Sequence, residues 1–267
     1  MNLKSDRAKK YIKGQKLYKL KIILAQIFVL ISFLLLWEFL SSKKIINSFL
    51  FSSPSAILNL LKQYIATGEL YSHISISLYE TILGLIIGTS LGIFIAILLW
   101  WSKTLSKILD PFLVVLNALP KTALAPIFII WAGTGVKGIV VVAVSISLVL
   151  TVLSAFNYFN SIEEEKIKML KSFGANKMQI LYKLVLPSNI VNLVNIVKIN
   201  IGMSWVGVIM GEFIVSRAGI GYLIVYGSQV FKLDLVMMGV LVLAIIAYVM
   251  YQIINIIEKS LKEKISK

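Results

Sequence analysis

The sequence predicts an all-α polytopic membrane protein with about six transmembrane helices. Three observations support this prediction. Hydrophobic residues make up 58% of the 267 residues, the mean hydropathy is +0.89, and the charged residues (15%) gather between long apolar runs. An ordinary globular domain is less apolar and carries more charge. The composition therefore excludes a soluble enzyme.

Each predicted span rests on a run of about 20 predominantly apolar residues, the length that crosses a hydrocarbon core of about 30 Å. The first run follows a basic stretch but is longer than the apolar part of a signal peptide, so we expect it to be retained. The third run is interrupted by Pro111, Pro120, Lys121 and Pro126. The six predicted spans are residues 22–40, 81–101, 109–131, 139–159, 191–215 and 235–257.

Basic residues predict the orientation of these spans. Segments 1–21, 102–108, 160–190 and 258–267 together carry 19 lysines and arginines, against 6 in segments 41–80, 132–138 and 216–234. Basic loops remain on the cytoplasmic side of a membrane. We therefore expect a multi-pass protein of the bacterial plasma membrane with both termini in the cytoplasm. Its parts are a basic segment (1–21), a transmembrane domain (22–257) and a tail (258–267).

The composition also excludes several kinds of chemistry. There is no cysteine and only one histidine, His73, so neither a disulfide framework nor a cysteine- or histidine-rich metal site is expected. Lysines outnumber arginines 25 to 2, whereas bidentate phosphate recognition favours arginine, so nucleic-acid binding is not predicted. No G-x-x-x-x-G-K-[ST] phosphate loop is present; the glycine-rich run 133–138 is followed by Ile139, and we interpret it as a tight turn.

Small residues mark where helices are expected to touch. A four-residue repeat of small side chains lets two backbones approach closely in lipid. Packing within one bundle is the favoured interpretation, and dimerisation through these faces is the alternative. The repeats are Gly84, Gly88, Gly92 and Ala96 in the second span, and Gly207 and Gly211 in the fifth. Outside the spans, Ser53-Pro54 predicts the start of a short amphipathic helix that ends near Gly68.

The cytoplasmic segment 160–190 predicts two short amphipathic helices. Ser161 and Glu164 have the spacing of a capping box, and Gly174 can adopt the positive φ of a helix C-cap. A second helix is expected from residue 177 to 186, ended by Pro187. The apolar stripes of these helices need a partner. They pack either on the protein's own spans or against a separate protein.

Three motifs resemble those of a known family. Gly174, nine further residues and then Leu184-Val185-Leu186-Pro187 match the G-x9-I-x-LP half of the cytoplasmic "EAA" loop of permease subunits of binding-protein-dependent ABC importers. The runs 117–133 and 211–222 resemble the subgroup that handles nitrate, sulfonates, taurine and thiamine-precursor pyrimidines. The family's Glu-Ala-Ala is absent, because Lys168, Met169 and Leu170 occupy those positions.

The resemblance implies a division of labour between several chains. Expected partners are a second permease copy or a related permease, cytoplasmic ATP-binding cassette subunits that hold ATP and Mg, an extracytoplasmic solute-binding protein, and membrane lipid. This chain would carry no cofactor and no catalytic residue. The residues expected to dock the ATPase are Leu170, Phe173, Gly174, Ala175, Met178, Leu186 and Pro187.

Polar groups inside the spans are candidates for the translocation pathway, because a charge at the bilayer centre is costly unless it is paired or hydrated. Pro120 and Lys121 lie at an expected break, and Trp205 and Glu212 lie within the fifth span. A structural ion pair with Arg217 is an equal alternative for Glu212. Lys198 is expected to snorkel, and Glu80 lies at a span end. Two other functions remain open, an ion-coupled secondary transporter and a membrane scaffold.

Overall fold

The computed structural model describes residues 3–265, so residues 1–2 and 266–267 of the predicted terminal segments lie outside the described residues. Within that range, five helices are long and apolar enough to cross a membrane. They are α1 (Leu3–Ser42), α4 (Glu69–Trp101), α7 (Val136–Asn160), α11 (Ile190–Val215) and α13 (Leu233–Ile265). The all-α membrane fold is confirmed, although α1 runs unbroken through the predicted boundary at residues 21 and 22.

The predicted third span is a broken pair of helices. It comprises α5 (Lys103–Ala118), a 3-10 turn (Lys121–Leu124) and α6 (Ala125–Ala132), and its two halves meet at 86°. Leu119 is extended, with φ −65° and ψ 137°, as expected for a residue before a proline. The 16 residues of α5 reach only about 24 Å, so α5 alone falls short of the core thickness.

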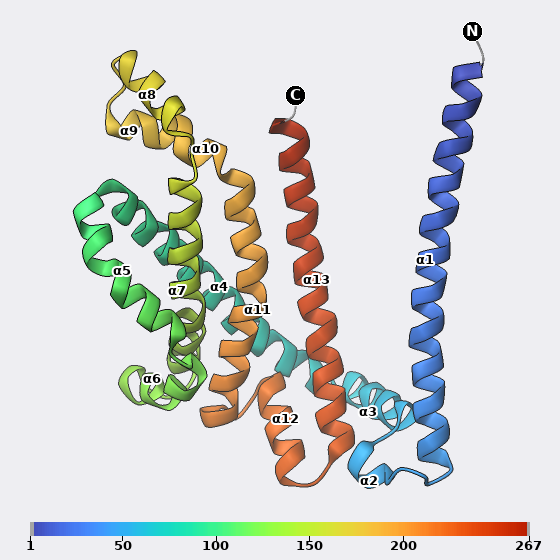
Figure 1. The fold of residues 1–267 in the computed structure, drawn as a ribbon. Coiled ribbons are helices and arrows are strands. Elements are labelled where there is room, and N and C mark those ends of the chain that lie inside the picture. The colour runs from blue at the N-terminus through green and yellow to red at the C-terminus, as the bar shows by residue number, and fades with distance from the viewer. Residues whose placement is uncertain (1–2, 266–267) are drawn as a thin grey trace.

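Short helices close the end of the bundle opposite the termini (Figure 1). They are α2 (Ser48–Phe51), α3 (Pro54–Ala66) and α12 (Ile220–Gln229). The predicted amphipathic helix is confirmed as α3, where the Ser53 side chain accepts from the Ala56 N–H at 3.2 Å. Glu38 accepts from the backbone N–H and the hydroxyl of Ser55, which ties α1 to the start of α3.

The central helix of the bundle is α7, which packs between α4 and α11. A Cβ on Gly84 would lie 2.7 Å from the Cβ of Ala143, and one on Gly207 would lie 2.4 Å from the Cα of the same residue. Both glycine stripes therefore face α7. The prediction that they serve packing within one bundle is confirmed.

Buried polar groups join the same three helices. The Asn200 side chain on α11 donates to the Thr89 hydroxyl on α4 at 2.8 Å and to the Thr151 hydroxyl on α7 at 2.7 Å. All three residues are buried. Because a hydrogen bond in a low-dielectric interior is costly to lose, these contacts fix the register of α4, α7 and α11.

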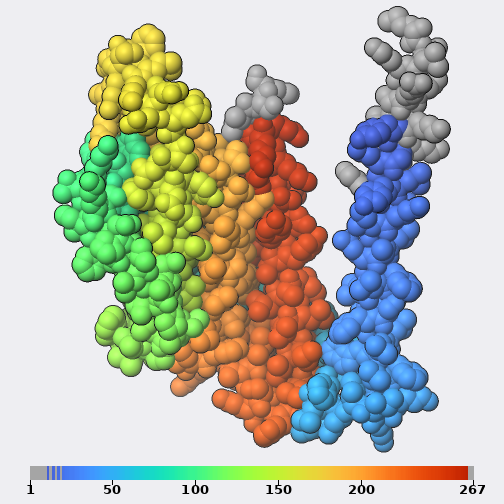
Figure 2. All heavy atoms as spheres, in the orientation of Figure 1, coloured from blue at the N-terminus to red at the C-terminus, as the bar shows by residue number. Residues whose placement is uncertain are grey.

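The first helix stands clear of the others along most of its length and meets them only near α2 and α3 (Figure 2). Its side chains from Ile22 to Phe39 are largely exposed apolar groups. Helix α1 begins, and helix α13 ends, at one and the same end of the molecule (Figure 1). That end also carries α8 (Glu164–Ser172), α9 (Lys177–Ile180) and α10 (Leu186–Ser188). We call this the coupling end, and α8–α10 the coupling segment.

Candidate functional site

The coupling segment begins without the predicted capping box. Ser161 instead follows α7, where its hydroxyl donates to the Tyr158 carbonyl at 2.9 Å, and α8 starts after Glu163 with no side-chain cap. The capping box is at the next helix: the Asn176 side chain accepts from the Gln179 N–H, and Gln179 accepts from the Asn176 N–H, both at 2.8 Å. The prediction at Ser161 was wrong because α7 continues past the last apolar residue of the span.

Gly174 makes the turn between α8 and α9. Its φ is +80°, which confirms the predicted C-cap. Its N–H donates to the Lys171 carbonyl at 2.9 Å, and the Ala175 N–H donates to the Leu170 carbonyl at 3.0 Å. This pair of bonds is a Schellman motif, which satisfies the last carbonyls of α8 and fixes the direction of the chain.

The second half of the coupling segment differs from the expected single helix. Residues Leu181–Val185 form a π-helical turn, and the Leu186 N–H donates to the Leu181 carbonyl. Proline cannot donate a backbone bond and crowds the carbonyl four residues earlier, so a wider turn before Pro187 relieves the clash. The helical run continues to Ser188, and Pro187 does not end it.

Two faces of the coupling segment are distinct. Ile180, Leu181 and Val185 are buried against α4, α7 and α11, and the partly buried Leu170, Ala175 and Leu186 pack on the same cluster. The opposite face is apolar and uncovered in this chain. It comprises Met169 (53% exposed), Phe173 (80%), Met178 (51%) and Tyr182 (62%). We call these four residues the outer face. Of the seven residues expected to dock the ATPase, Phe173 and Met178 lie on it, and Gly174 and Pro187 are also exposed.

Lys121 and Pro120 lie at the bend between α5 and α6. The half-buried Lys121 amine donates to the Asn117 carbonyl at 3.1 Å, at the C-terminal end of α5. A cation at that position is favoured by the helix dipole. The structure therefore gives Lys121 a local stabilising contact, and its predicted place on a pathway stays a prediction.

Glu212 is fully buried between α4, α11 and α12. It accepts hydrogen bonds from the Ser77 hydroxyl and from the Gly221 N–H. Arg217 is exposed and forms no ion pair with Glu212, so the alternative of a structural ion pair between them was wrong. A Cβ on Gly219, where φ is +116°, would lie 2.4 Å from the Glu212 carboxylate. The glycines of the 211–222 run thus make room for this carboxylate.

Glu80 joins this cluster, which the sequence did not indicate. It is 1% exposed, and its carboxyl group lies near that of Glu212. Nearby, the His73 Nδ1 accepts from the Gly219 N–H at 2.9 Å. The signal that could have found the cluster is the helical spacing of His73, Ser77 and Glu80, which continues the glycine stripe of α4.

Two other candidate residues of the spans also lie inside the bundle, where the Trp205 indole N–H finds no hydrogen-bond partner among the described residues. Trp205 is 4% exposed and belongs to the apolar core shared by α3, α4, α11, α12 and α13. Lys198 does not snorkel as predicted. It pairs with Glu258 and donates to the Asn255 side chain at 2.9 Å, which joins α11 to α13.

Comparisons with known proteins point in one direction. Residues 88–267 match the family described as the binding-protein-dependent transport system inner membrane component. A putative aliphatic sulfonates transport permease of Bacillus subtilis is 26% identical over 85% of this chain and 82% of that protein. The taurine transport system permease of Escherichia coli is 25% identical over 81% of each chain. A formylaminopyrimidine transport permease of Halalkalibacterium halodurans is 26% identical over 71% of this chain and 75% of that protein.

Among solved structures, an inward-facing form of the MetNI methionine ABC transporter has a similar fold. The TM-score is 0.64, with 18% identity over 72% of this chain and 95% of that one. The similarity covers almost the whole of that transporter chain. It shows a shared architecture of the transmembrane helices.

Proposed function

Because the chain belongs to the family of binding-protein-dependent transport system inner membrane components, where it is an ABC importer permease, we propose which solute it moves and which partners drive it. The solute we propose is small. It is either an anion of the sulfonate or nitrate kind or a heterocyclic vitamin precursor. The support is the set of relatives whose names refer to aliphatic sulfonates, taurine and formylaminopyrimidine.

The proposal that a separate ATPase drives transport rests on the structure of the coupling segment. Its inner face is anchored on the bundle, and its outer face presents apolar side chains beyond the end of α7 and α11. Exposed apolar patches rimmed by charge are typical of protein-binding surfaces. Closure of two ATPase subunits would move this segment, and alternating access would follow from the rigid connection to α7 and α11.

The pathway itself we assign to the bent pair rather than to the buried cluster. Pro120 and Lys121 are at a break where backbone groups are free to face water. Trp205 and Glu212 are enclosed by this one chain, and their burial favours a structural role. A second copy of the permease, or a related one, would complete the pathway.

Reconstitution tests this assignment against the other classes of function. The permease is purified from native membranes with its bound subunits and placed in liposomes with the solute-binding protein. We expect an ATPase subunit in the complex and solute uptake that requires ATP. Uptake driven by a proton or sodium gradient without ATP would mean an ion-coupled transporter, and a complex without uptake would mean a scaffold.

Identification of the solute needs a separate measurement. The thermal stability of the partner binding protein is compared across taurine, aliphatic sulfonates, nitrate and formylaminopyrimidine. A stabilised binding protein identifies the substrate class, because mass action raises the melting temperature only for a ligand that binds the folded state. Stabilisation by none of these compounds would contradict the proposed class.

A further inference from the structure

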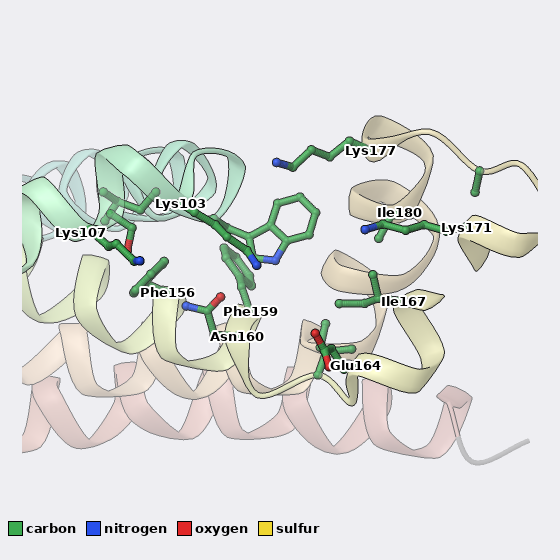
Figure 3. Close-up of a pocket in the computed structure, with 15 residues that line it drawn as sticks. Lys103, Lys107, Phe156, Phe159, Asn160, Glu164, Ile167, Lys171, Lys177 and Ile180 are labelled. Carbon is green, nitrogen blue, oxygen red and sulfur yellow. The ribbon is translucent and has the colours of Figure 1, made fainter. Parts of the chain in front are cut away.

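A cavity of about 510 Å³ lies at the coupling end, between the coupling segment and the ends of α4, α5 and α7. It belongs neither to the outer face nor to the bend at Lys121. Side chains from both sides reach toward it: Lys103 and Lys107 come from α5, whereas Lys171 comes from α8 and Lys177 from α9 (Figure 3). The four lysines are separated by up to 74 positions in the sequence, so the fold brings them together.

The charge around this cavity is unbalanced. Lys103, Lys107 and Lys171 have no ion-pair partner among the residues that the structure describes. Glu164 is the one acidic residue of the lining, and it is already paired with Lys168 at 3.1 Å. The hydrogen bond and charge of Lys168 are the main reason that the pKa of Glu164 is lowered, and the charges of Lys103 and Lys171 lower it further. The cavity therefore has a net positive charge that the described residues do not compensate.

Apolar side chains complete the walls. Trp100, Phe156 and Phe159 line the cavity at the ends of α4 and α7. Lys177 lies 5.8 Å from the centroid of the Trp100 ring and donates to the Trp101 carbonyl, so its ammonium group is held at the rim. A small hydrated anion would not contact the aromatic side chains favourably, whereas an anion with an apolar body would contact both the lysines and the aromatic side chains.

The depth of the cavity indicates where such a ligand comes from. Trp100 and Lys103 lie where α4 ends and α5 begins, which is the boundary between an apolar span and a basic loop. Lipid headgroups lie at this level, and basic pockets between helices on the cytoplasmic side recognise anionic headgroups. We propose that this lysine cavity binds the phosphate of an anionic glycerophospholipid from the cytoplasmic leaflet.

Such a lipid would contact two parts of the molecule, the bent pair and the coupling segment. Lys103 and Lys107 belong to the bent pair, and Lys171 belongs to the coupling segment. A bound headgroup would hold the coupling segment against α5. The site thus adds a lipid requirement to the connection between the outer face and the bundle, and it does not depend on which solute is carried.

Native mass spectrometry of the full-length protein tests the site. The protein is exchanged into detergent with phosphatidylglycerol, with phosphatidylcholine, or with inorganic phosphate alone. We expect retained phosphatidylglycerol for the wild type. A K103Q/K107Q/K171Q variant should bind it at least about 5-fold more weakly, because each lysine near an anionic surface contributes on the order of that factor.

The control is Lys183→Gln, which removes one positive charge from the coupling segment at an exposed position that does not line the cavity. It should retain the lipid as the wild type does. Equal melting temperatures of both variants in phosphatidylcholine show that neither is misfolded. Equal lipid loss in the control and the triple variant would overturn the proposal. So would undiminished retention in the triple variant, or an equal melting-temperature rise from inorganic phosphate alone, which would indicate a soluble anion instead.

Discussion

The Ser77 hydroxyl on α4 donates to the Glu212 carboxylate on α11 and accepts from the Ile220 N–H, which begins α12, at 2.7 Å. One small side chain thereby joins three helices at a buried point. Its neighbour Glu80, one turn further along α4, is buried near the same carboxylate. The end of the bundle opposite the coupling segment is therefore held by polar contacts as well as by apolar packing.

Loss of that hydroxyl is expected to destabilise the protein. Ser77→Ala leaves the Ile220 N–H without its acceptor and removes one donor from Glu212, and an unpaired buried group costs about 1–3 kcal/mol. A lower melting temperature in detergent is the expected result. The control Ser75→Ala removes an exposed hydroxyl that donates only to the Ser72 carbonyl within the same helix. Equal melting temperatures for the two variants would show that the Ser77 contacts contribute nothing.

The Gly207 contact with α7 gives a second prediction. Gly207→Ala would place a Cβ 2.4 Å from the Cα of Ala143, so two helix backbones would have to separate. Overpacking of this kind costs about 1–3 kcal/mol, and we expect a lower melting temperature. Gly202 on the same helix has no neighbour within 4 Å of such a Cβ. Gly202→Ala should therefore be neutral or stabilising, and a loss of stability there would mean that α11 tolerates no alanine for other reasons.

The spans were predictable because a membrane imposes a length and an apolar composition that local sequence alone displays. The beginning of α4 was not. Its apolar run suggests a start near Thr81, but the helix begins at Glu69, because His73 and Ser77 find polar partners on α11, on α12 and in the loop between them. A hydropathy pattern records each residue's own polarity and contains no information about a partner more than 130 positions away.

In the coupling segment, too, local sequence predicted one feature and not another. The turn at Gly174 was predictable from the residue type, since few other residues adopt a φ of +80° without strain. In the sequence, Ile167, Leu170 and Phe173 have the spacing of one apolar helix face. They do not share a face in the structure, because the helix ends at Ser172 and the chain turns there. Phe173 consequently points outward, while Leu170 packs inward.

Orientation in the membrane is testable because the chain contains no cysteine. Single cysteines are introduced at Lys183 in the coupling segment and at the exposed Lys137 in the first turn of α7. The basic bias predicts that an impermeant thiol reagent added to intact cells labels position 137 and leaves position 183 unlabelled until the membrane is permeabilised. Labelling of position 183 in intact cells would reverse the proposed orientation.

The bend at Pro120 gives a prediction about transport. If the Lys121 amine faces the pathway, Lys121→Met should lower the rate of solute uptake. The free energy of unfolding should fall by no more than about 1 kcal/mol, because the substitution removes a single hydrogen bond to a carbonyl. Lys137→Met, in the first turn of α7, removes the same charge from an exposed site and should leave uptake unchanged. Unchanged uptake in Lys121→Met would restrict Lys121 to its contact with α5.

The outer face gives the last prediction. Phe173→Asp places a charge at the centre of an apolar surface, at a side chain that is 80% exposed and so contributes little to the fold. We expect the variant to reach the membrane with an unchanged melting temperature and to co-purify with less ATPase. Phe231→Asp is the matched control, because Phe231 is 67% exposed in the loop before α13, where aspartate also tolerates its φ of 56°.

Gly174→Val separates the shape of this surface from its chemistry. Valine at a φ of +80° costs about 1–2 kcal/mol, so the turn should open and displace Phe173 without altering any side chain of the outer face. Co-purification of the ATPase and solute-stimulated ATP hydrolysis should both fall, as in Phe173→Asp. Full ATPase binding and coupled hydrolysis in both variants would show that the ATPase docks elsewhere, since either the charge or the displaced turn removes the surface that the proposal requires.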